Sequence, residues 1–222
     1  MSALSLRRPA LLLAAAFAVV AVTGCASLFT SPPKKLYRLT PVSRFPPGLP
    51  HVPGQLLVDV PIAPPGLDTE RIALTRPPLT LDYFADSQWT DRAPIVIQTA
   101  LLDSFENSGD VTALDREAGE LRADFALRLQ IRHFEAAYDD PDKPDNPPRI
   151  RVALNVRLVD LASRTIVGEK VVTHELPAEA NDVPHIAVAF DEALGAAMGD
   201  IVAWTLTTPA LMQRPPLPAK SP

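Results

Sequence analysis

The residue with the clearest chemistry in this sequence is Cys25, because it is the only cysteine in the chain. It follows an apolar run over residues 11–22, and Arg7 and Arg8 precede that run. Positive charge followed by a short apolar stretch is typical of an export signal, and this stretch is shorter than the ~20 residues that span a membrane. The sequence therefore predicts an exported chain with its one thiol at the end of the signal.

The residues around this thiol resemble the lipobox of bacterial lipoproteins, since the small residue Gly24 stands directly before Cys25. In that class a diacylglyceryl group alkylates the thiol, the peptide is cut before the cysteine, and the new amine is usually acylated, for example with palmitate. The resemblance implies a signal peptide over residues 1–24, cleavage between Gly24 and Cys25, and lipid on Cys25. Ala26, in place of Asp, favours the outer membrane by the sorting rule of enterobacteria. The alternative is a buried cysteine in an uncleaved membrane anchor.

The other residue types that support catalysis or metal binding do not form a recognisable motif. The four histidines lack metal-ligand spacing, and there is no HExxH, CxxC, GxSxG or GxGxxG pattern. These histidines are His51, His133, His174 and His185. The carboxylate pairs Asp139-Asp140 and Asp191-Glu192 are common surface features, and a lipidated cysteine is no longer a nucleophile. We expect no enzyme activity, no cofactor and no metal, and a surface hydrolase is the catalytic alternative.

Charge and cysteine content narrow the classes of partner. The formal net charge is −5, and loss of Arg7 and Arg8 with the signal makes the remaining chain more acidic. Such a chain is a poor candidate for nucleic acid, which attracts basic surfaces. Membrane attachment must then depend on acyl chains, of which two or more are needed for a stable anchor. With one cysteine no intramolecular disulfide can form, so the fold depends on its core.

The 25 prolines mark the divisions of the chain. We expect an acylated tether over residues 25–35, whose roughly ten residues reach ~35 Å when extended. A single folded domain follows over residues 36–207, interrupted by an exposed acidic, proline-rich loop over residues 139–148. Residues 208–222 are rich in proline and predict a disordered tail.

Seven segments show strand patterns, and one of them alternates apolar and polar residues over the eleven residues from Leu121 to Ile131. The others cover residues 36–40, 55–60, 71–75, 79–84, 150–158 and 165–176. Two segments show helical patterns. The first is capped by Thr90 or Asp91 and ends at residues 107–109, and the second runs from Asp182 to Thr207. A GxxxG pattern at Gly195 and Gly199 favours close packing of the second helix on the sheet over a membrane helix pair.

These elements predict an α/β fold of the α+β type in the order ββββ-α-ββββ-α, with a mixed sheet and both helices on one face. The other face then carries rows of arginines and is at least partly solvated. The rows consist of Arg122, Arg128, Arg132, Arg151 and Arg157. We favour a solvated face balanced by nearby acids, and the alternative is a site for lipid phosphates or for an acidic partner.

Three blocks of sequence carry a more specific resemblance. They are LYRLTP at residues 36–41, VDVPIAPPGLDTERIAL at residues 58–74, and YFADSQW at residues 83–89, which leads into the first helix. With the lipobox, these blocks resemble the ABC-type transport auxiliary lipoprotein family, which includes the lipoprotein partner of paraquat-inducible-type MCE systems. The resemblance covers roughly residues 25–207. It implies a mixed α/β domain similar to the N-terminal domain of TolB, and it transfers no catalytic residue.

The resemblance implies a lipid-anchored adaptor that faces the periplasm from the outer membrane. Its implied partners are an MCE-domain protein with an ABC permease and ATPase, which move phospholipid-like molecules between the two membranes. Trp89 and Tyr83 are candidate anchors for a partner, with core packing as the favoured interpretation, and a homo-oligomer is conceivable. The alternative is a structural outer-membrane lipoprotein that binds other envelope proteins or glycan without a transport role.

Overall fold

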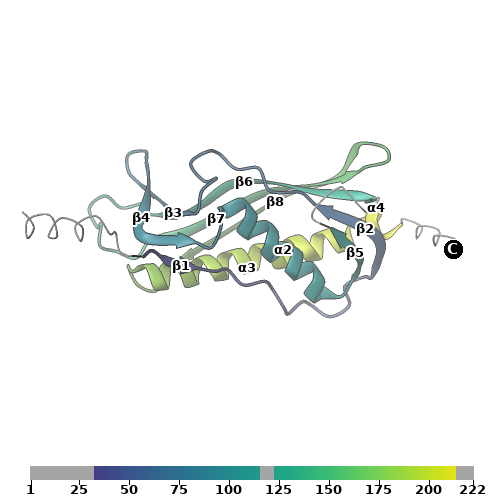
Figure 1. The fold of residues 1–222 in the computed structure, drawn as a ribbon, viewed down its shortest axis with the longest axis horizontal. Coiled ribbons are helices and arrows are strands. Elements are labelled where there is room, and N and C mark those ends of the chain that lie inside the picture. The colour runs from purple at the N-terminus through teal and green to yellow at the C-terminus, as the bar shows by residue number, and fades with distance from the viewer. Residues whose placement is uncertain (1–32, 116–122, 214–222) are drawn as a thin grey trace, which may run out of the picture. The chain divides into compact units, whose positions relative to one another are not determined.

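The computed structural model describes residues 33–115 and 123–213. Eight strands and three helices occur in this part of the chain (Figure 1). The strands are β1 (Lys35–Tyr37), β2 (Val52–Val58), β3 (Arg71–Arg76), β4 (Thr80–Trp89), β5 (Val111–Asp115), β6 (Phe125–Ala137), β7 (Arg149–Asp160) and β8 (Thr165–Pro177). The helices are α2 (Ala93–Ser108), α3 (Val183–Thr207) and the short α4 (Pro209–Met212).

The eight strands of the described chain form one mixed sheet around β6. One edge of β6 pairs antiparallel with β7 along its whole length, and β7 pairs in the same way with β8. The other edge is shared, because β2 pairs parallel with residues 125–127 and β3 pairs parallel with residues 136–137. β5 extends the sheet beyond β2, and β4 and β1 extend it beyond β3.

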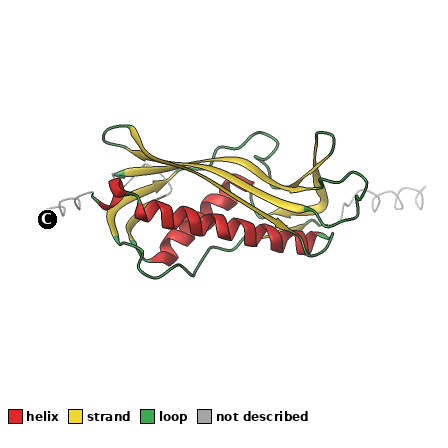
Figure 2. Ribbon diagram, turned by 180° about the vertical axis from the view of Figure 1, so that it is seen from behind, coloured by secondary structure: helices red, strands yellow, loops and turns green. Residues whose placement is uncertain are grey.

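Both long helices cover the same face of this sheet, as the two ribbon views show (Figure 2). The predicted fold class, the one-sided helices and the order ββββ-α-ββββ-α are therefore confirmed. The three strands after α2 that were located by their alternating pattern are β6, β7 and β8, and β5 is the fourth. β6 begins at Phe125, not at Leu121, and continues past a bulge between Ile131 and His133.

The two long helices begin in different ways. Asp182 caps α3, and its carboxylate accepts the backbone N–H of His185 at 3.0 Å. The predicted cap of α2 by Thr90 or Asp91 is wrong, because α2 begins after Arg92 and no side chain bonds its first turn. The carboxylate of Asp91 is engaged instead by the backbone N–H of Arg92, at 2.6 Å. Gly109 ends α2 at φ 69°, a conformation that favours glycine.

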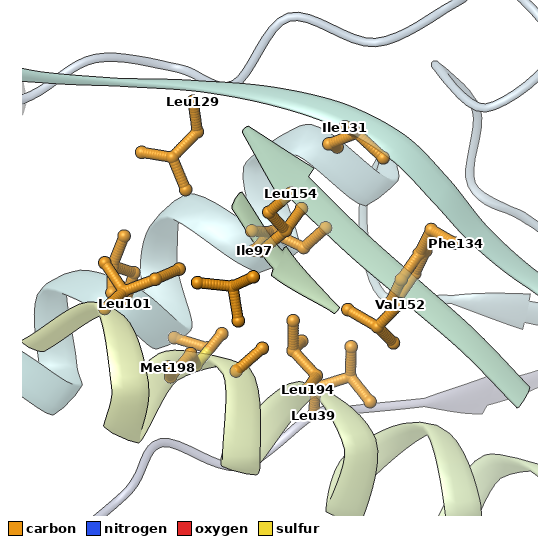
Figure 3. Close-up of a cluster of buried hydrophobic side chains, with 14 of the residues drawn as sticks. Leu39, Ile97, Leu101, Leu129, Ile131, Phe134, Val152, Leu154, Leu194 and Met198 are labelled. Atoms are coloured by element: carbon orange, nitrogen blue, oxygen red, sulfur yellow. The ribbon is translucent and has the colours of Figure 1, made fainter. Parts of the chain in front are cut away.

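The core lies between the sheet and the two helices (Figure 3). Leu129, Ile131 and Phe134 of β6 point inward beside Val152 and Leu154 of β7. They meet residues of both helices and of the segment that follows β1, namely Ile97, Leu101, Leu194, Met198 and Leu39. Alternation in the strands and 3.6-residue spacing in the helices thus bring the same apolar faces together.

The segment that follows β1 is held on the two helices by side-chain hydrogen bonds. Asp191 of α3 accepts the backbone N–H of Thr40 at 2.6 Å and its hydroxyl at 2.5 Å. On α2, Ser104 accepts the N–H of Val42, and Asn107 donates to the carbonyl of Val42. We call residues 38–45 the strap.

The structure corrects the packing that the GxxxG pattern of α3 predicted. An ideal Cβ on Gly195 would have as its nearest neighbour Val42 of the strap, at 4.0 Å, and a Cβ on Gly199 would meet nothing within that distance. These glycines are therefore not the means by which α3 packs closely on the sheet. The close approach to α3 comes instead from Gly168 of β8, where a Cβ would lie 3.0 Å from the ring of Trp204.

The ordered part of the chain also extends past the predicted domain end at residue 207. Thr208 is buried, and Leu211 of α4 is buried in the core cluster. Of the predicted tail, residues 208–213 thus belong to the packed structure, and the rest lies outside the described residues. The predicted acidic loop is exposed over residues 139–147, as expected from its charge.

Candidate functional site on the open face of the sheet

The two aromatic residues that were candidate partner anchors both serve the fold. Trp89 is only 1% exposed, and its ring lies 5.2 Å from that of Phe190 and 5.6 Å from that of Phe134. Tyr83 is half-buried, donates its hydroxyl to the carbonyl of Gly66 at 3.0 Å, and has the guanidinium of Arg71 over its ring. The favoured interpretation as packing residues is therefore correct for both.

The PPGLDTER segment that carries the family resemblance is a structural clasp at the start of α2. Leu67 is buried in the core, and Asp68 forms a two-bond ion pair with Arg92, at 2.8 and 3.0 Å. The carbonyl of Thr69 accepts the N–H of Ala93, the first residue of the helix. An ideal Cβ on Gly66 would contact Cδ2 of the exposed Leu81 side chain, so a larger residue here would require that side chain to move. The contacts of these residues thus position the start of α2, and we do not regard the segment as a ligand site.

The arginines of the open face are mostly paired with acids, as expected for a solvated sheet face. Arg128 binds Asp59 at 3.0 Å, and Arg157 binds Glu169 at 2.9 Å. Arg151 binds Asp139 at 2.8 Å and Glu175 at 3.6 Å. Of the two other arginines in the rows, Arg132 is exposed at the β6 bulge, and Arg122 lies outside the described residues.

One part of this face is hollowed into a cavity of about 520 Å³, which we call the arginine trough. It is lined by Ile62, Arg128, Leu129, Gln130, Asn155, Arg157, Val159, Arg164 and Ile166. Arg128 and Arg157 are direct partners across β6 and β7, and Arg164 stands in the β7–β8 turn. Two like charges placed opposite each other repel, and here each one has its own carboxylate at the margin.

The exposed apolar residues of the trough are two isoleucines that the alternation pattern did not single out. Ile62 follows β2, bridges to Gln130 of β6, and is 72% exposed. Ile166 pairs with Val159 next to a bulge and is 56% exposed. The signal for Ile62 was its place inside the VDVPIAPPGLDTERIAL block. Nothing in the sequence marked Ile166 or Arg164 as members of the same site.

A second hollow of about 400 Å³ lies at the β3–β4 hairpin. Its buried carboxylate, Glu135, accepts the backbone N–H of Phe134 at 2.7 Å and lies 2.7 Å from Nδ1 of His133. Burial raises the pKa of Tyr138 there, and the guanidinium of Arg76 over its ring partly offsets this rise. The charges in this hollow are mixed and engaged with each other, so it is the weaker candidate for a ligand.

The histidines are spread over the molecule, each beside a carboxylate or in a loop. His174 lies 3.0 Å from Asp200 across β8 and α3, and His185 lies beside the cap residue Asp182. Hydrogen bonds from His185 hold the pKa of Asp182 below its ordinary value, and the same pair raises the pKa of His185. His51 lies in a loop before β2. Within residues 33–115 and 123–213, no cluster of three potential metal ligands occurs.

The predicted acylation site, Cys25 with Gly24 before it, lies outside the described residues. In the described ranges no helix is both long and apolar enough to cross a membrane. Of the residues predicted from the sequence, the fold brings Arg128 and Arg157 together in the arginine trough, and it brings His133, Asp139 and Arg151 together in the second hollow.

Comparison with known proteins places these features in a family. A model for the ABC-type transport auxiliary lipoprotein component matches residues 37–202. The crystal structure of a DUF330-family protein from Xanthomonas campestris has a TM-score of 0.73 and 28% identity, covering 78% of this chain and 95% of that one. A second crystal structure, of an uncharacterized protein, has a TM-score of 0.60 at 11% identity and covers 78% of this chain and 99% of that one, so it shows the fold alone.

A curated relative is known as well. An uncharacterized protein of Bradyrhizobium diazoefficiens is 29% identical over 177 residues, which are 79% of this chain and 46% of the relative. The chain therefore spans about half the length of the curated relative that it matches.

Proposed function

Because this chain belongs to the ABC-type transport auxiliary lipoprotein family, we propose that it is the lipid-anchored auxiliary component of an MCE-type ABC transport system. It acts as a non-enzymatic adaptor in phospholipid transport between the inner and outer membranes, and thereby in envelope integrity. It is anchored in the outer membrane and faces the periplasm. Its partners are an MCE-domain protein and the permease and ATPase of the same system.

The observation that carries this proposal is the family match over residues 37–202, which takes in β2 to β8, α2, and α3 as far as Val202. The lipobox resemblance supports the anchor, since Cys25 stands ten residues before β1. Residues 25–35 then serve as the tether between the acyl chains and the folded unit. A name that describes an auxiliary transport role favours an adaptor over a catalyst.

The partners are tested by crosslinking intact cells that carry a C-terminally tagged copy and identifying the proteins that copurify. We expect an MCE-domain protein with its permease or ATPase. Recovery of only cell-wall or other envelope proteins would contradict the transport role and favour the structural lipoprotein. Two copies with different tags in the same cells report at once whether the protein forms a homo-oligomer.

The anchor is tested by Cys25→Ala, compared with a version that carries a cleavable signal without a lipobox. Both should leave the membrane fraction and complement a deletion strain poorly, because neither can be acylated. Full complementation by either soluble version would show that anchoring is dispensable. Retention of Cys25→Ala in the membrane would point to the uncleaved anchor.

A further inference from the structure

Three guanidinium groups around the arginine trough have unused hydrogen-bond donors. Arg128 and Arg157 each bind their carboxylate through Nε, and their terminal nitrogens make no hydrogen bond within the described chain. Arg164 has no hydrogen-bond or ion-pair partner there. Since a guanidinium offers five N–H donors in a fork that fits carboxylate and phosphate oxygens, much of this capacity is free for a ligand.

The charge balance of the trough favours an anion. Its lining contains three arginines and no acidic residue. Asp59 and Glu169 at the margin compensate two of the three positive charges, which leaves that of Arg164 uncompensated. An anionic oxygen in the trough would accept charge-assisted hydrogen bonds, which are roughly twice as strong as neutral ones.

The same trough has walls that suit a hydrocarbon chain. Ile62 and Ile166 are exposed, and Val159 and Leu129 also belong to the lining. The row Ile62–Gln130–Asn155–Val171 continues the surface across three strands to Val171, which is 61% exposed. Exposed large apolar residues that gather beside polar ones are typical of binding sites.

Asn155 gives the trough one further polar feature. Its side-chain Oδ1 is shielded from solvent and has no hydrogen-bond partner in the structure. Buried polar atoms are nearly always paired, so an unpaired acceptor in a lining residue suits a ligand that donates a hydroxyl hydrogen. The volume of about 520 Å³ lies within the ~300–1,000 Å³ of ordinary small-ligand sites.

From these features we infer that the arginine trough binds an anionic amphiphile, a molecule with a phosphate-like head and at least one alkyl chain. The head lies among Arg128, Arg157 and Arg164, and the chain lies along Ile62 and Ile166. The inference deepens the proposed lipid-transport function and rests on it for its biological role. The binding itself is measured on the purified protein alone.

Three probes separate the contributions of head and chain by calorimetric titration below the micelle concentration. They are n-decyl phosphate, inorganic phosphate and decyl maltoside. We expect n-decyl phosphate to bind at least tenfold more tightly than either of the others, and its affinity to fall with added salt. If inorganic phosphate binds as tightly as n-decyl phosphate, the trough is only an anion site. If decyl maltoside binds as tightly, the trough is only an apolar groove. Either result would overturn the inference.

Arg164→Gln is the most direct variant, because Arg164 has no partner that its loss would leave unpaired. It should weaken n-decyl phosphate binding about tenfold, which is 1.4 kcal/mol. Arg149→Gln is the matched control, since Arg149 lies on β7 outside the trough lining. Equal affinities of the two variants would place the bound head elsewhere and refute the assignment.

The apolar wall is tested in the same way by Ile166→Ser, with Leu79→Ser as its control. Leu79 is 99% exposed at the β3–β4 hairpin and lies outside the trough. We expect only Ile166→Ser to weaken binding, by at least threefold, with an unchanged melting temperature. If n-decyl phosphate binds as expected but no MCE-type partner copurifies, the proposed function fails and the site stands. If an MCE-type partner copurifies but n-decyl phosphate does not bind as expected, the site is refuted and the proposed function stands.

Discussion

Trp89 provides a sharp test of the packing described above, because one substitution separates a core role from a docking role. Its ring, with those of Phe134 and Phe190, forms a triangle whose centroids lie 5.0–5.6 Å apart. The three rings join the end of β4 to β6 and to α3. Trp89 thus packs the end of β4 against β6 and α3.

Trp89→Ala removes this contact and leaves a cavity. Substitutions of buried Phe or Trp by Ala cost ~3–5 kcal/mol, and each aromatic pair lost contributes ~0.5–1.5 kcal/mol beyond its buried area. Against a total stability of ~5–15 kcal/mol for a domain, we expect a loss of about 4 kcal/mol. Trp89→Phe keeps a ring in the cluster and should lose less.

The loss is measured by urea denaturation of the purified protein, followed by far-UV circular dichroism. Trp204→Ala is the matched control, since Trp204 is the same residue type but half-buried on α3 and outside the triangle. It should cost less than half as much as Trp89→Ala. A loss below ~1 kcal/mol for Trp89→Ala, together with loss of copurifying partners, would refute the core role and restore the docking role.

Three further predictions concern the strap and the helix ends. Asp191→Ala removes both hydrogen bonds to Thr40 and should cost ~1–2 kcal/mol in urea denaturation, with faster hydrogen exchange along the strap; unchanged exchange would show that Asp191 does not hold it. Gly109→Ala places a Cβ at φ 69° and should cost about 1 kcal/mol by the same assay, whereas a neutral effect would contradict the left-handed end of α2. Because folding raises the pKa of His185, this residue contributes its full stability below its ordinary pKa of 6.5, and the contribution is lost as pH rises through the raised pKa. Because folding lowers the pKa of Asp182, this residue contributes its stability above its ordinary pKa of 3.8, and the contribution is lost as pH falls through the lowered pKa. The stability difference between the wild type and His185→Ala should therefore be largest between pH 3.8 and 6.5, and a difference that does not vary with pH would exclude the ion pair.

The strands and the two long helices were predictable because each has one buried face that produces a regular pattern. In β7, for example, Ile150, Val152, Leu154, Val156 and Leu158 alternate inward and are all fully buried. The pattern failed where a bulge changes the phase. After Ile131 the inward residue is Phe134, so alternation read from the N-terminal part of β6 stops three residues short of it.

The candidate site was less predictable because it is assembled from segments that are distant in sequence. The alternating pattern predicted Arg128 and Arg157 on the open face of the sheet. It could not predict that Ile62, which follows β2, bridges to Gln130 of β6. Nor could the pattern place Arg164 in the same cavity, because the position of Arg164 depends on its own backbone conformation in the β7–β8 turn, where its φ is 57°. The cap of α2 was missed for a related reason: Asp91 bonds the next residue, and the clasp at Asp68 orients the helix start instead.

The place of the trough in the fold bears on how an anchored protein would use it. The chain enters the folded unit at β1, and Figure 1 shows β1 and the β7–β8 hairpin toward opposite ends of the sheet. Under the proposed acylation of Cys25, the tether would join the folded unit at β1, whereas Arg164 lies in the β7–β8 turn and Ile166 near the start of β8. In that arrangement the trough would lie toward the end of the sheet opposite the tether. A bound amphiphile would then be presented away from the anchor, which would suit transfer to or from a partner protein.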